Sequence, residues 1–162
     1  MGNVRKVFVV DSDAQYSQKI EDRVSQMPDV EVYTFKSVEE ASKYIDSRPD
    51  AILVDLYMDS EENDVYNGAD MLNIVKSQNP EIDVIILTPD YTVSGAIALV
   101  EQRAFDCIAK TNENVARIES MLHIIFRHKE LEENGQRYRN SLYFMSASCM
   151  TILFGMSGYL MV

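Results

Sequence analysis

The chain has 162 residues and a formal net charge of −11, a length that suits one domain of ordinary size with an extension. This acidity argues against nucleic acid as a direct partner, because no basic stripe is available to neutralise phosphates. With only two histidines and two cysteines, neither a histidine-based zinc site nor a disulfide framework is expected. The N-terminus runs directly into a predicted strand, so we expect no signal peptide and a reduced, cytoplasmic location.

Four short apolar segments each end in a polar side chain that could carry chemistry. They are rich in β-branched residues, a pattern that predicts strands buried on both faces. The segments Val7–Val10, Ile52–Val54, Val84–Leu87 and Phe105–Ala109 are followed in turn by Asp11, Asp55, Thr88 and Lys110. A fifth segment, Val30–Phe35, alternates apolar with polar residues and predicts a less buried strand.

Helical patterns lie between these segments. The first follows Asp11–Asp13, where either carboxylate could cap a helix. A capping box at Ser37–Glu40 predicts a second helix to about Ser47. Further helices are expected over Gly68–Gln78, over Thr92–Arg103, and from Asn114 to Gly135, where the glycine should end or bend the last helix.

Alternating strands and helices predict a doubly wound α/β fold with a five-stranded parallel sheet, flavodoxin-like and CheY-like, in the order 2-1-3-4-5. That order places the first and third strands side by side. Asp11 and Asp55 should therefore face each other beyond the carboxyl ends of the strands, with Thr88 and Lys110 to one side.

The C-terminal region has a different character. We expect residues 1–126 to form the domain, 127–140 a polar helical linker, and 141–162 an apolar tail without a charged residue. A stretch of about 20 uncharged residues is long enough to span a bilayer as a helix. Arg137 and Arg139 just upstream would then stay on the cytoplasmic side. The tail is predicted to be either a transmembrane helix, which would anchor the protein at the inner face of the cytoplasmic membrane, or a dimerisation helix.

Two carboxylates at adjacent strand ends repel each other unless a cation lies between them. Mg²⁺ is the natural occupant, because it prefers oxygen ligands and retains several waters. With Asp11 as a metal ligand, Asp55 could attack a phosphoryl group. Lys110 would balance the charge on the phosphoryl oxygens, and the Thr88 hydroxyl would donate a hydrogen bond to one of them. Asp13 is a candidate for a further metal ligand.

From about Val4 to Phe126 the chain resembles the receiver domain of bacterial two-component response regulators. The resemblance rests on Val-Val-Asp11, Leu-Val-Asp55-Leu-Tyr-Met, Ile-Leu-Thr88 and Ala-Phe-Asp-Cys-Ile-Ala-Lys110. It implies that Asp55 takes a phosphoryl group from a histidine kinase or phosphotransfer protein, with Mg²⁺ also bound by the backbone carbonyl of Tyr57. It also implies a signalling domain that catalyses only its own phosphoryl transfer, with output through the face of the fourth helix, fifth strand and fifth helix.

Several positions depart from the family pattern. Ser12 stands where a second acid is usual, which predicts weaker metal binding, and Thr111 stands where a proline usually follows the lysine. Pro89 replaces a small residue and Cys107 an aromatic one, while Gly68 comes thirteen residues after Asp55, so the intervening loop is lengthened. These departures favour a rival hypothesis, a phosphorylation-independent receiver-like scaffold or dimerisation module. A flavin-binding protein of similar topology is less consistent, because Asp11-Ser12-Asp13 would repel a phosphate.

The sequence therefore predicts a single-domain response regulator that signals through protein contacts, with a downstream protein target or a second copy of itself. The acidic loop at 59–64 could suggest a calcium site, but an EF-hand loop needs glycine at its sixth place, where Asp64 stands. A solvated insertion, or a docking element for a partner, is the preferred interpretation of that loop.

Overall fold

The computed structural model describes the backbone of residues 3–58, 67–89 and 92–159, and the side chains of these residues except 93, 94 and 144–159. Internal contacts divide the chain into two units, residues 1–125 and residues 126–162. The acidic loop at 59–64 lies outside the described residues.

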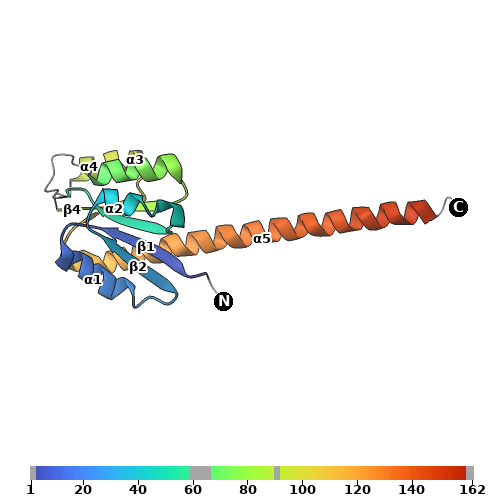
Figure 1. Ribbon diagram of the computed structural model, residues 1–162, viewed down its shortest axis with the longest axis horizontal. Coiled ribbons are helices and arrows are strands. Elements are labelled where there is room, and N and C mark those ends of the chain that lie inside the picture. Colours follow the sequence, from blue (N-terminus) through green and yellow to red (C-terminus); the bar gives the residue numbers. More distant parts are fainter. Residues whose placement is uncertain (1–2, 59–66, 90–91, 160–162) are drawn as a thin grey trace. The chain divides into compact units, whose positions relative to one another are not determined.

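A five-stranded sheet forms the centre of the first unit, with all neighbouring strands parallel and in the order β2-β1-β3-β4-β5 (Figure 1). The strands are β1 (Arg5–Val10), β2 (Val30–Phe35), β3 (Ala51–Asp55), β4 (Asp83–Thr88) and β5 (Asp106–Ala109). The predicted doubly wound fold and its strand order are confirmed. The three central strands carry long runs of β-branched residues, as expected for strands covered on both faces.

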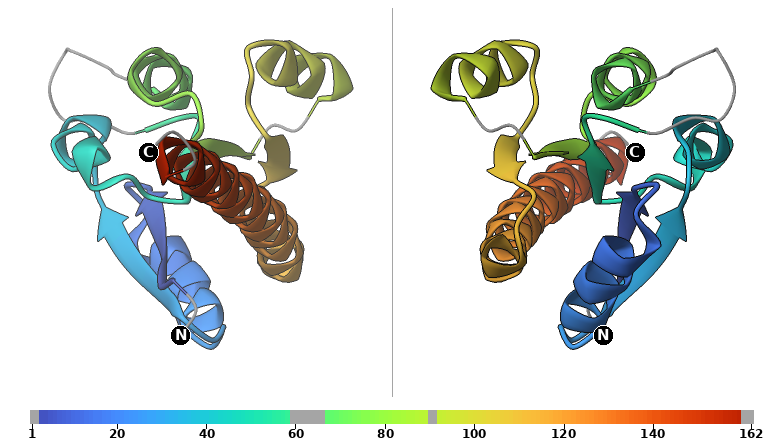
Figure 2. Two further views of the ribbon diagram at one scale, coloured as in Figure 1. Left: turned by 90° about the vertical axis from the view of Figure 1, so that its right-hand side faces the viewer. Right: turned by 90° about the vertical axis from the view of Figure 1, so that its left-hand side faces the viewer.

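Helices cover both faces of the sheet (Figure 2). They are α1 (Ala14–Val24), α2 (Val38–Ser42), α3 (Gly68–Gln78), α4 (Val93–Glu101) and α5 (Val115–Tyr159), with short 3₁₀ turns at η1 (Ile45–Ser47) and η2 (Asn112–Asn114). Within the first unit, α1 and the start of α5 lie on one face, while α2, α3 and α4 lie on the other.

The alternation of side chains along each strand divides the core into two layers. Phe8, Ile52 and Ile86 belong to the cluster that packs beneath α2, α3 and α4. Val9 and Leu53 point to the opposite face, where α1 and α5 bring further buried side chains, Ile20, Val24, Ile118, Leu122 and Ile125. Covering both faces keeps water from the strands and leaves their carboxyl ends as the place where polar groups gather.

The second helix is shorter than its capping box predicts. Ser37 Oγ accepts a hydrogen bond from the Glu40 N–H at 3.1 Å, as expected, but the Glu40 carboxylate accepts from the Lys36 N–H instead of completing the box. The α-helix ends at Ser42, and bonds of 3₁₀ type carry the chain on to Ser47. Pro49 prevents helical structure from continuing beyond this turn, since a proline disfavours helical geometry in the residue before it, here Arg48.

The alternative that the last helix ends at Gly135 is wrong, because α5 continues through this residue to Tyr159. A glycine inside a helix costs about 1 kcal/mol relative to alanine. Its neighbours Glu132, Glu133, Gln136 and Arg137 are good helix formers, and they offset that cost.

No helix in the described part of the chain is long and apolar enough to cross a membrane. The backbone of 141–159 is helical. The side chains of 144–162 lie outside the described residues, and a dimerisation role for the tail stays a prediction.

Gly68 is required where α3 begins, against the end of β3. A Cβ atom at this position would lie 2.6 Å from the carbonyl oxygen of Asp55 and 2.9 Å from the Cα of Leu56. Both atoms belong to the backbone and cannot rotate away. The Gly68 N–H also donates to the Leu56 carbonyl at 3.2 Å. The glycine therefore sets how closely α3 approaches the strand that carries Asp55.

We expect Gly68→Ala to lower the free energy of unfolding by about 1–3 kcal/mol, the usual cost of overpacking. Gly135→Ala is the matched control, because a Cβ there meets nothing within 4 Å and alanine favours the helix. Urea unfolding should show a lower midpoint for the first variant and no loss for the second. Equal midpoints for Gly68→Ala and the wild type would contradict the close packing of α3 on β3.

Candidate functional site

The strand ends bring the predicted residues together at one edge of the sheet. Val10 pairs with Val54 in the β1–β3 register. Asp11 follows Val10 and Asp55 follows Val54, so the two carboxylates come next to each other at the ends of neighbouring strands. Thr88, the last residue of β4, pairs with Ala109 of β5, and Lys110 follows. Parallel strands place all four residues on the carboxyl side of the sheet, as the sequence predicts.

Lys110 joins the two carboxylates. Its Nζ lies 2.8 Å from Asp11 Oδ1 and 2.7 Å from Asp55 Oδ2, and all three side chains are largely shielded from water. The Lys110 N–H also donates to the Thr88 carbonyl at 2.8 Å, which ties the end of β5 to β4. One ammonium thus balances two carboxylates, and the site retains an excess of negative charge.

Backbone donors orient both carboxylates. The Tyr57 N–H donates to Asp55 Oδ1 at 3.1 Å, and the Asp13 N–H donates to Asp11 Oδ1 at 2.8 Å. Each bond spans two residues, as in the Asx turns that aspartate commonly forms. These contacts leave the Asp55 carboxylate held by one donor on each oxygen, Lys110 and Tyr57.

Two buried oxygens of the site have no hydrogen-bond partner among the described residues, Asp11 Oδ2 and Thr88 Oγ1. Buried polar atoms are normally hydrogen-bonded, and an unpaired one costs about 1–3 kcal/mol. A further group that hydrogen-bonded or coordinated either oxygen would remove that cost.

Burial dominates the electrostatics of Asp11. It raises the pKa of the Asp11 carboxyl above its ordinary value, although the Lys110 ammonium and the Asp13 N–H act in the opposite direction. The pKa of Lys110 is also raised: burial lowers it, but the hydrogen bonds to Asp11 and Asp55 together outweigh that effect. The site therefore disfavours the charged form of Asp11 and favours the charged form of Lys110.

The donor set fits a hard divalent cation such as Mg²⁺. Two carboxylates lie together, and Asp11 Oδ2 is available. No group of three or more His, Cys, Asp or Glu side chains comes together within the described residues. A bound ion would thus depend on Asp11, Asp55, a backbone oxygen and water, which suits the tendency of Mg²⁺ to keep several waters.

Asp13 is placed differently from the other predicted metal ligands. Its Oδ1 accepts from the N–H groups of Gln15 and Tyr16 at 2.9 and 3.1 Å, so its carboxylate caps α1. Its predicted role as a metal ligand gains no support from this geometry. The roles of the Tyr57 carbonyl, Asp11 and Asp55 as ligands remain predictions.

Sequence analysis did not identify Tyr16 as part of the site. It lies in the first turn of α1, is buried, and has its ring centroid 5.3 Å from Lys110 Nζ. In the sequence Tyr16 looks like any aromatic residue on the buried face of a helix, so no sequence pattern could have marked it as a site residue.

Comparison with known families identifies this arrangement. The response regulator receiver domain family matches residues 7–123. The chain belongs to this family. Receivers are signalling domains of two-component systems, which interact with histidine kinases or phosphotransfer proteins and typically bind Mg²⁺.

Solved receivers share the fold at low sequence identity. The signal receiver domain of a protein described as a LuxO repressor, from Vibrio parahaemolyticus, superimposes with a TM-score of 0.71 at 22% identity, covering 80% of this chain and 95% of its own. The Francisella response regulator 1452 receiver domain gives 0.67 at 21%, covering 77% and 98%. The response regulator domain of Thermotoga maritima CheB gives 0.62 at 22%, covering 77% and 96%. No curated protein matches this sequence significantly.

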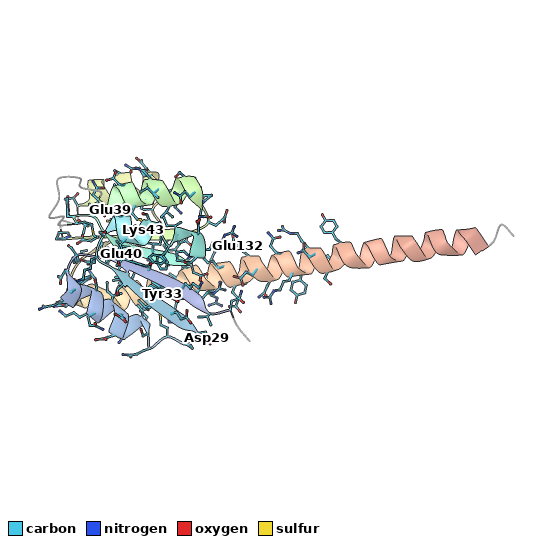
Figure 3. The ribbon with its side chains drawn as sticks, in the orientation of Figure 1. Asp29, Tyr33, Glu39, Glu40, Lys43 and Glu132 are labelled. Carbon is cyan, nitrogen blue, oxygen red and sulfur yellow. The ribbon has the colours of Figure 1, made fainter. Side chains whose placement is uncertain are left out.

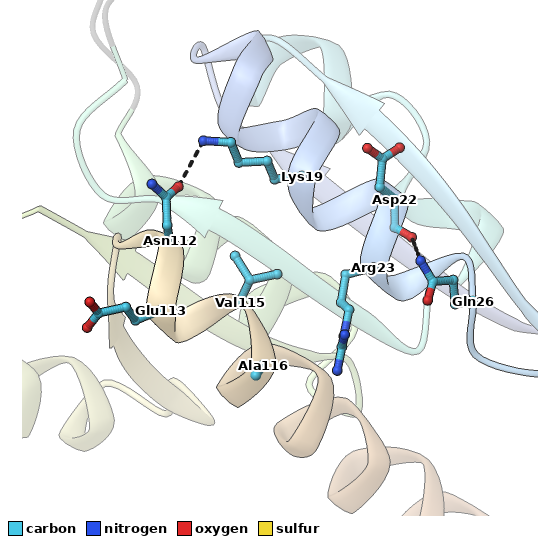
Figure 4. Close-up of a pocket in the computed structure, with 8 residues that line it drawn as sticks. All are labelled: Lys19, Asp22, Arg23, Gln26, Asn112, Glu113, Val115 and Ala116. Atoms are coloured by element: carbon cyan, nitrogen blue, oxygen red, sulfur yellow. Dashed lines mark hydrogen bonds between the residues drawn. The ribbon is translucent and has the colours of Figure 1, made fainter.

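A polar groove of about 530 Å³ lies between α1 and the start of α5 in the receiver (Figure 4). Lys19 and Arg23 line it from α1, and Asn112 and Glu113 line it from the turn after β5. The Lys19 ammonium donates to Asn112 Oδ1 at 2.8 Å across the groove. Asn112 is only two residues beyond Lys110, so the groove is adjacent to the site along the chain.

We expect Asp11→Asn to raise the free energy of unfolding at pH 7 in EDTA, because it removes a buried charge whose desolvation raises the pKa of Asp11. The folded-state pKa of Asp11 is raised, so its contribution to stability is full below the unfolded value near 3.8 and is lost as the pH rises through the folded value. The advantage of the variant should therefore shrink as the pH falls toward that range.

Urea unfolding at a series of pH values measures this effect. Asp22→Asn is the control, since that carboxylate is exposed on α1, and its effect should be small throughout. A loss of stability in Asp11→Asn at pH 7 would mean that attraction to Lys110 outweighs the cost of burial.

Proposed function

We propose that this receiver accepts a phosphoryl group on Asp55 from a histidine kinase or phosphotransfer protein, with Mg²⁺ held by Asp11, Asp55 and the Tyr57 carbonyl. The observation that carries the proposal is the position of Lys110, whose ammonium contacts both Asp11 and Asp55 at 2.7–2.8 Å. A cation shared by two buried carboxylates is suited to binding an incoming phosphoryl group, because charge can be redistributed over short distances.

Asp55 would act as the nucleophile. An Oδ atom forms a bond to phosphorus while the phosphorus–nitrogen bond of the phosphohistidine breaks, and the imidazole leaves with the electron pair and takes up a proton. The Tyr57 N–H and Lys110 fix the orientation of the carboxylate before the attack. Such preorganisation lowers the barrier, because the reacting groups need little rearrangement.

The other residues would stabilise the product. Lys110 can shift from a carboxylate oxygen to a phosphoryl oxygen, and the buried Thr88 hydroxyl, which has no partner within the described residues, can donate to another. A bound Mg²⁺ would supply further positive charge against the phosphoryl oxygens. Ser12 lies at the position of the usual second acid, so the affinity for the ion is expected to be low.

The groove between α1 and η2 would contact the phosphodonor protein. It is open and lined largely by charged and amide side chains, and its residue Asn112 follows Lys110 by two positions. Lys19 and Arg23 alternate there with Asp22 and Glu113, a mixed charge pattern that favours a specific protein partner over nonspecific attraction.

Intact-mass spectrometry of the full chain tests the proposal. With Mg²⁺ and either acetyl phosphate or phosphoramidate, we expect the wild type to gain the mass of one phosphoryl group. Asp55→Asn should abolish the gain, because the amide is not a nucleophile, and Asp46→Asn, an exposed carboxylate elsewhere, should leave it intact. Undiminished uptake in Asp55→Asn would refute Asp55 as the acceptor, and no uptake from either donor would favour a phosphorylation-independent scaffold.

A second candidate function, a dimerisation scaffold, is favoured by the exposed apolar residues of α5 beyond the first unit. Leu131, Tyr138 and Leu142 are 65–75% exposed and lie seven and then four residues apart. This is the spacing of a heptad seam, on which Gly135 is the intervening position and His128 the position before Leu131. We infer that the seam pairs with a second copy of the chain.

Charge supports a parallel arrangement of the two copies. Arg127 precedes the seam residue His128, and Glu132 follows the seam residue Leu131, so Arg127 of one copy would face Glu132 of the other. Glu132 is exposed on α5 (Figure 3), and His128 Nδ1 lies 3.8 Å from its carboxylate within the same helix. Pairing would bury the exposed apolar side chains, and such packing is the usual source of stability for long helices.

Light scattering coupled to size-exclusion chromatography tests this pairing. We expect the full chain to be a dimer at micromolar concentration and Leu131→Glu to be a monomer, because a buried carboxylate is costly at a seam position. Gln136→Glu places the same charge off the seam and should remain a dimer. A monomeric wild type, or a dimeric Leu131→Glu, would contradict the seam.

A further inference from the structure

Tyr16 connects the first turn of α1 with the strand end that carries Lys110. The Asp13 cap fixes its backbone, since Asp13 Oδ1 accepts from the Tyr16 N–H at 3.1 Å. Its side chain is directed inward and is only 5% exposed. Tyr16 thus reaches the site from α1, whereas the other site residues come from the ends of strands.

The ring of Tyr16 contacts the ammonium of Lys110. The distance from Lys110 Nζ to the ring centroid is 5.3 Å, within the range of a cation–π interaction. Such an attraction is stronger where water is excluded, and the Lys110 side chain is only 13% exposed. The ring therefore gives the ammonium a third attachment, in addition to the Asp11 and Asp55 carboxylates.

The hydroxyl of Tyr16 holds the backbone just after Lys110. It donates to the Thr111 carbonyl at 3.2 Å. Burial raises the pKa of Tyr16 above its ordinary value, with the Asp11 and Asp55 carboxylates adding to the effect and Lys110 opposing it. The hydroxyl is consequently a protonated donor at neutral pH.

We propose that Tyr16 is a positioning residue for Lys110, in which the ring holds the ammonium and the hydroxyl fixes the backbone that follows. This inference rests on the proposed role of Lys110 in phosphoryl transfer. A lysine ammonium is a point charge on a flexible stem of four carbons, so its position depends on what surrounds it.

The ring contact has a property that the carboxylate contacts lack. When Asp55 becomes covalently bound, its charge moves outward to the phosphoryl oxygens, and the attraction that Lys110 feels changes in direction. The face of the tyrosine ring is unaffected by that change. Tyr16 would keep the ammonium within reach of the phosphoryl group in both states.

A series of aromatic replacements tests the ring contact without removing the side chain. Tyr16→Phe keeps the ring, and fluorinated phenylalanines at position 16 weaken its negative face stepwise at nearly constant shape. The readout is the side-chain ¹⁵Nζ resonance of Lys110, measured in the full chain. It is assigned as the resonance that is missing from the spectrum of Lys110→Arg. Lys76, whose ammonium donates to the Ile82 carbonyl at 2.6 Å, is the internal reference.

We expect the Lys110 resonance to persist in Tyr16→Phe and to shift and broaden progressively with fluorination, while the Lys76 resonance stays constant. A purely structural aromatic predicts no such gradation. A Lys110 resonance that is identical across the series would overturn the ring contact. This measurement needs no phosphodonor, so it decides the inference even if Asp55 takes no phosphoryl group.

Two further measurements separate the hydroxyl from the ring. Tyr16→Phe removes the bond to Thr111, and we expect exchange of the Lys110 backbone amide, which donates to Thr88, to accelerate roughly fivefold. Unchanged exchange would overturn the role of the hydroxyl. If the receiver is phosphorylated, the rate of uptake should fall roughly fivefold from phenylalanine to the most fluorinated ring. A constant rate would overturn the link between ring and chemistry.

Discussion

The contact of Lys110 with two buried carboxylates is the interaction on which the rest of this structure depends. Asp11 and Asp55 lie at neighbouring strand ends, where burial alone would make two like charges very costly. The ammonium at 2.7–2.8 Å from both offsets part of that cost, but one negative charge remains in excess. Burial, with a smaller contribution from the neighbouring Asp55 carboxylate, raises the pKa of Asp11 above its ordinary value. The fold therefore maintains a site that is stabilised further by added positive charge.

The parallel sheet makes this arrangement possible because it places the ends of separate strands within reach of one another. The β1–β3 and β4–β5 registers set which residues meet, and each carboxylate is then oriented by a backbone N–H two residues later. Gly68 lets α3 begin directly against the carbonyl of Asp55. Packing thus determines the position of the nucleophile candidate as firmly as hydrogen bonding does.

The strands and four of the site residues could be predicted from the sequence, because buried parallel strands appear as short runs rich in β-branched residues and their last residues are easily located. For that reason the sequence could identify four site residues, Asp11, Asp55, Thr88 and Lys110. Tyr16 could not be identified in this way, since its contact with Lys110 joins residues 94 positions apart through packing that no local pattern records. The early end of α2 and the passage of α5 through Gly135 were missed because single-residue preferences of about 1 kcal/mol are easily outweighed by neighbours.

The two unpaired oxygens of the site help to decide between a phosphoryl acceptor and a scaffold that has lost this chemistry. Asp11 Oδ2 and Thr88 Oγ1 are buried and have no partner within the described residues, although the rest of the site is closely hydrogen-bonded. A scaffold that had lost phosphoryl chemistry would gain stability by replacing either group with an apolar one of similar size. Both groups are present together with Lys110 and Asp55, and each matches a need of the proposed reaction, a metal ligand and a donor to the phosphoryl group. An ion and a phosphoryl group bound as proposed would pair both oxygens and offset this cost. In the proposed reaction Ser12 would weaken the binding of the metal ion, while Asp55, Thr88 and Lys110 would keep their roles.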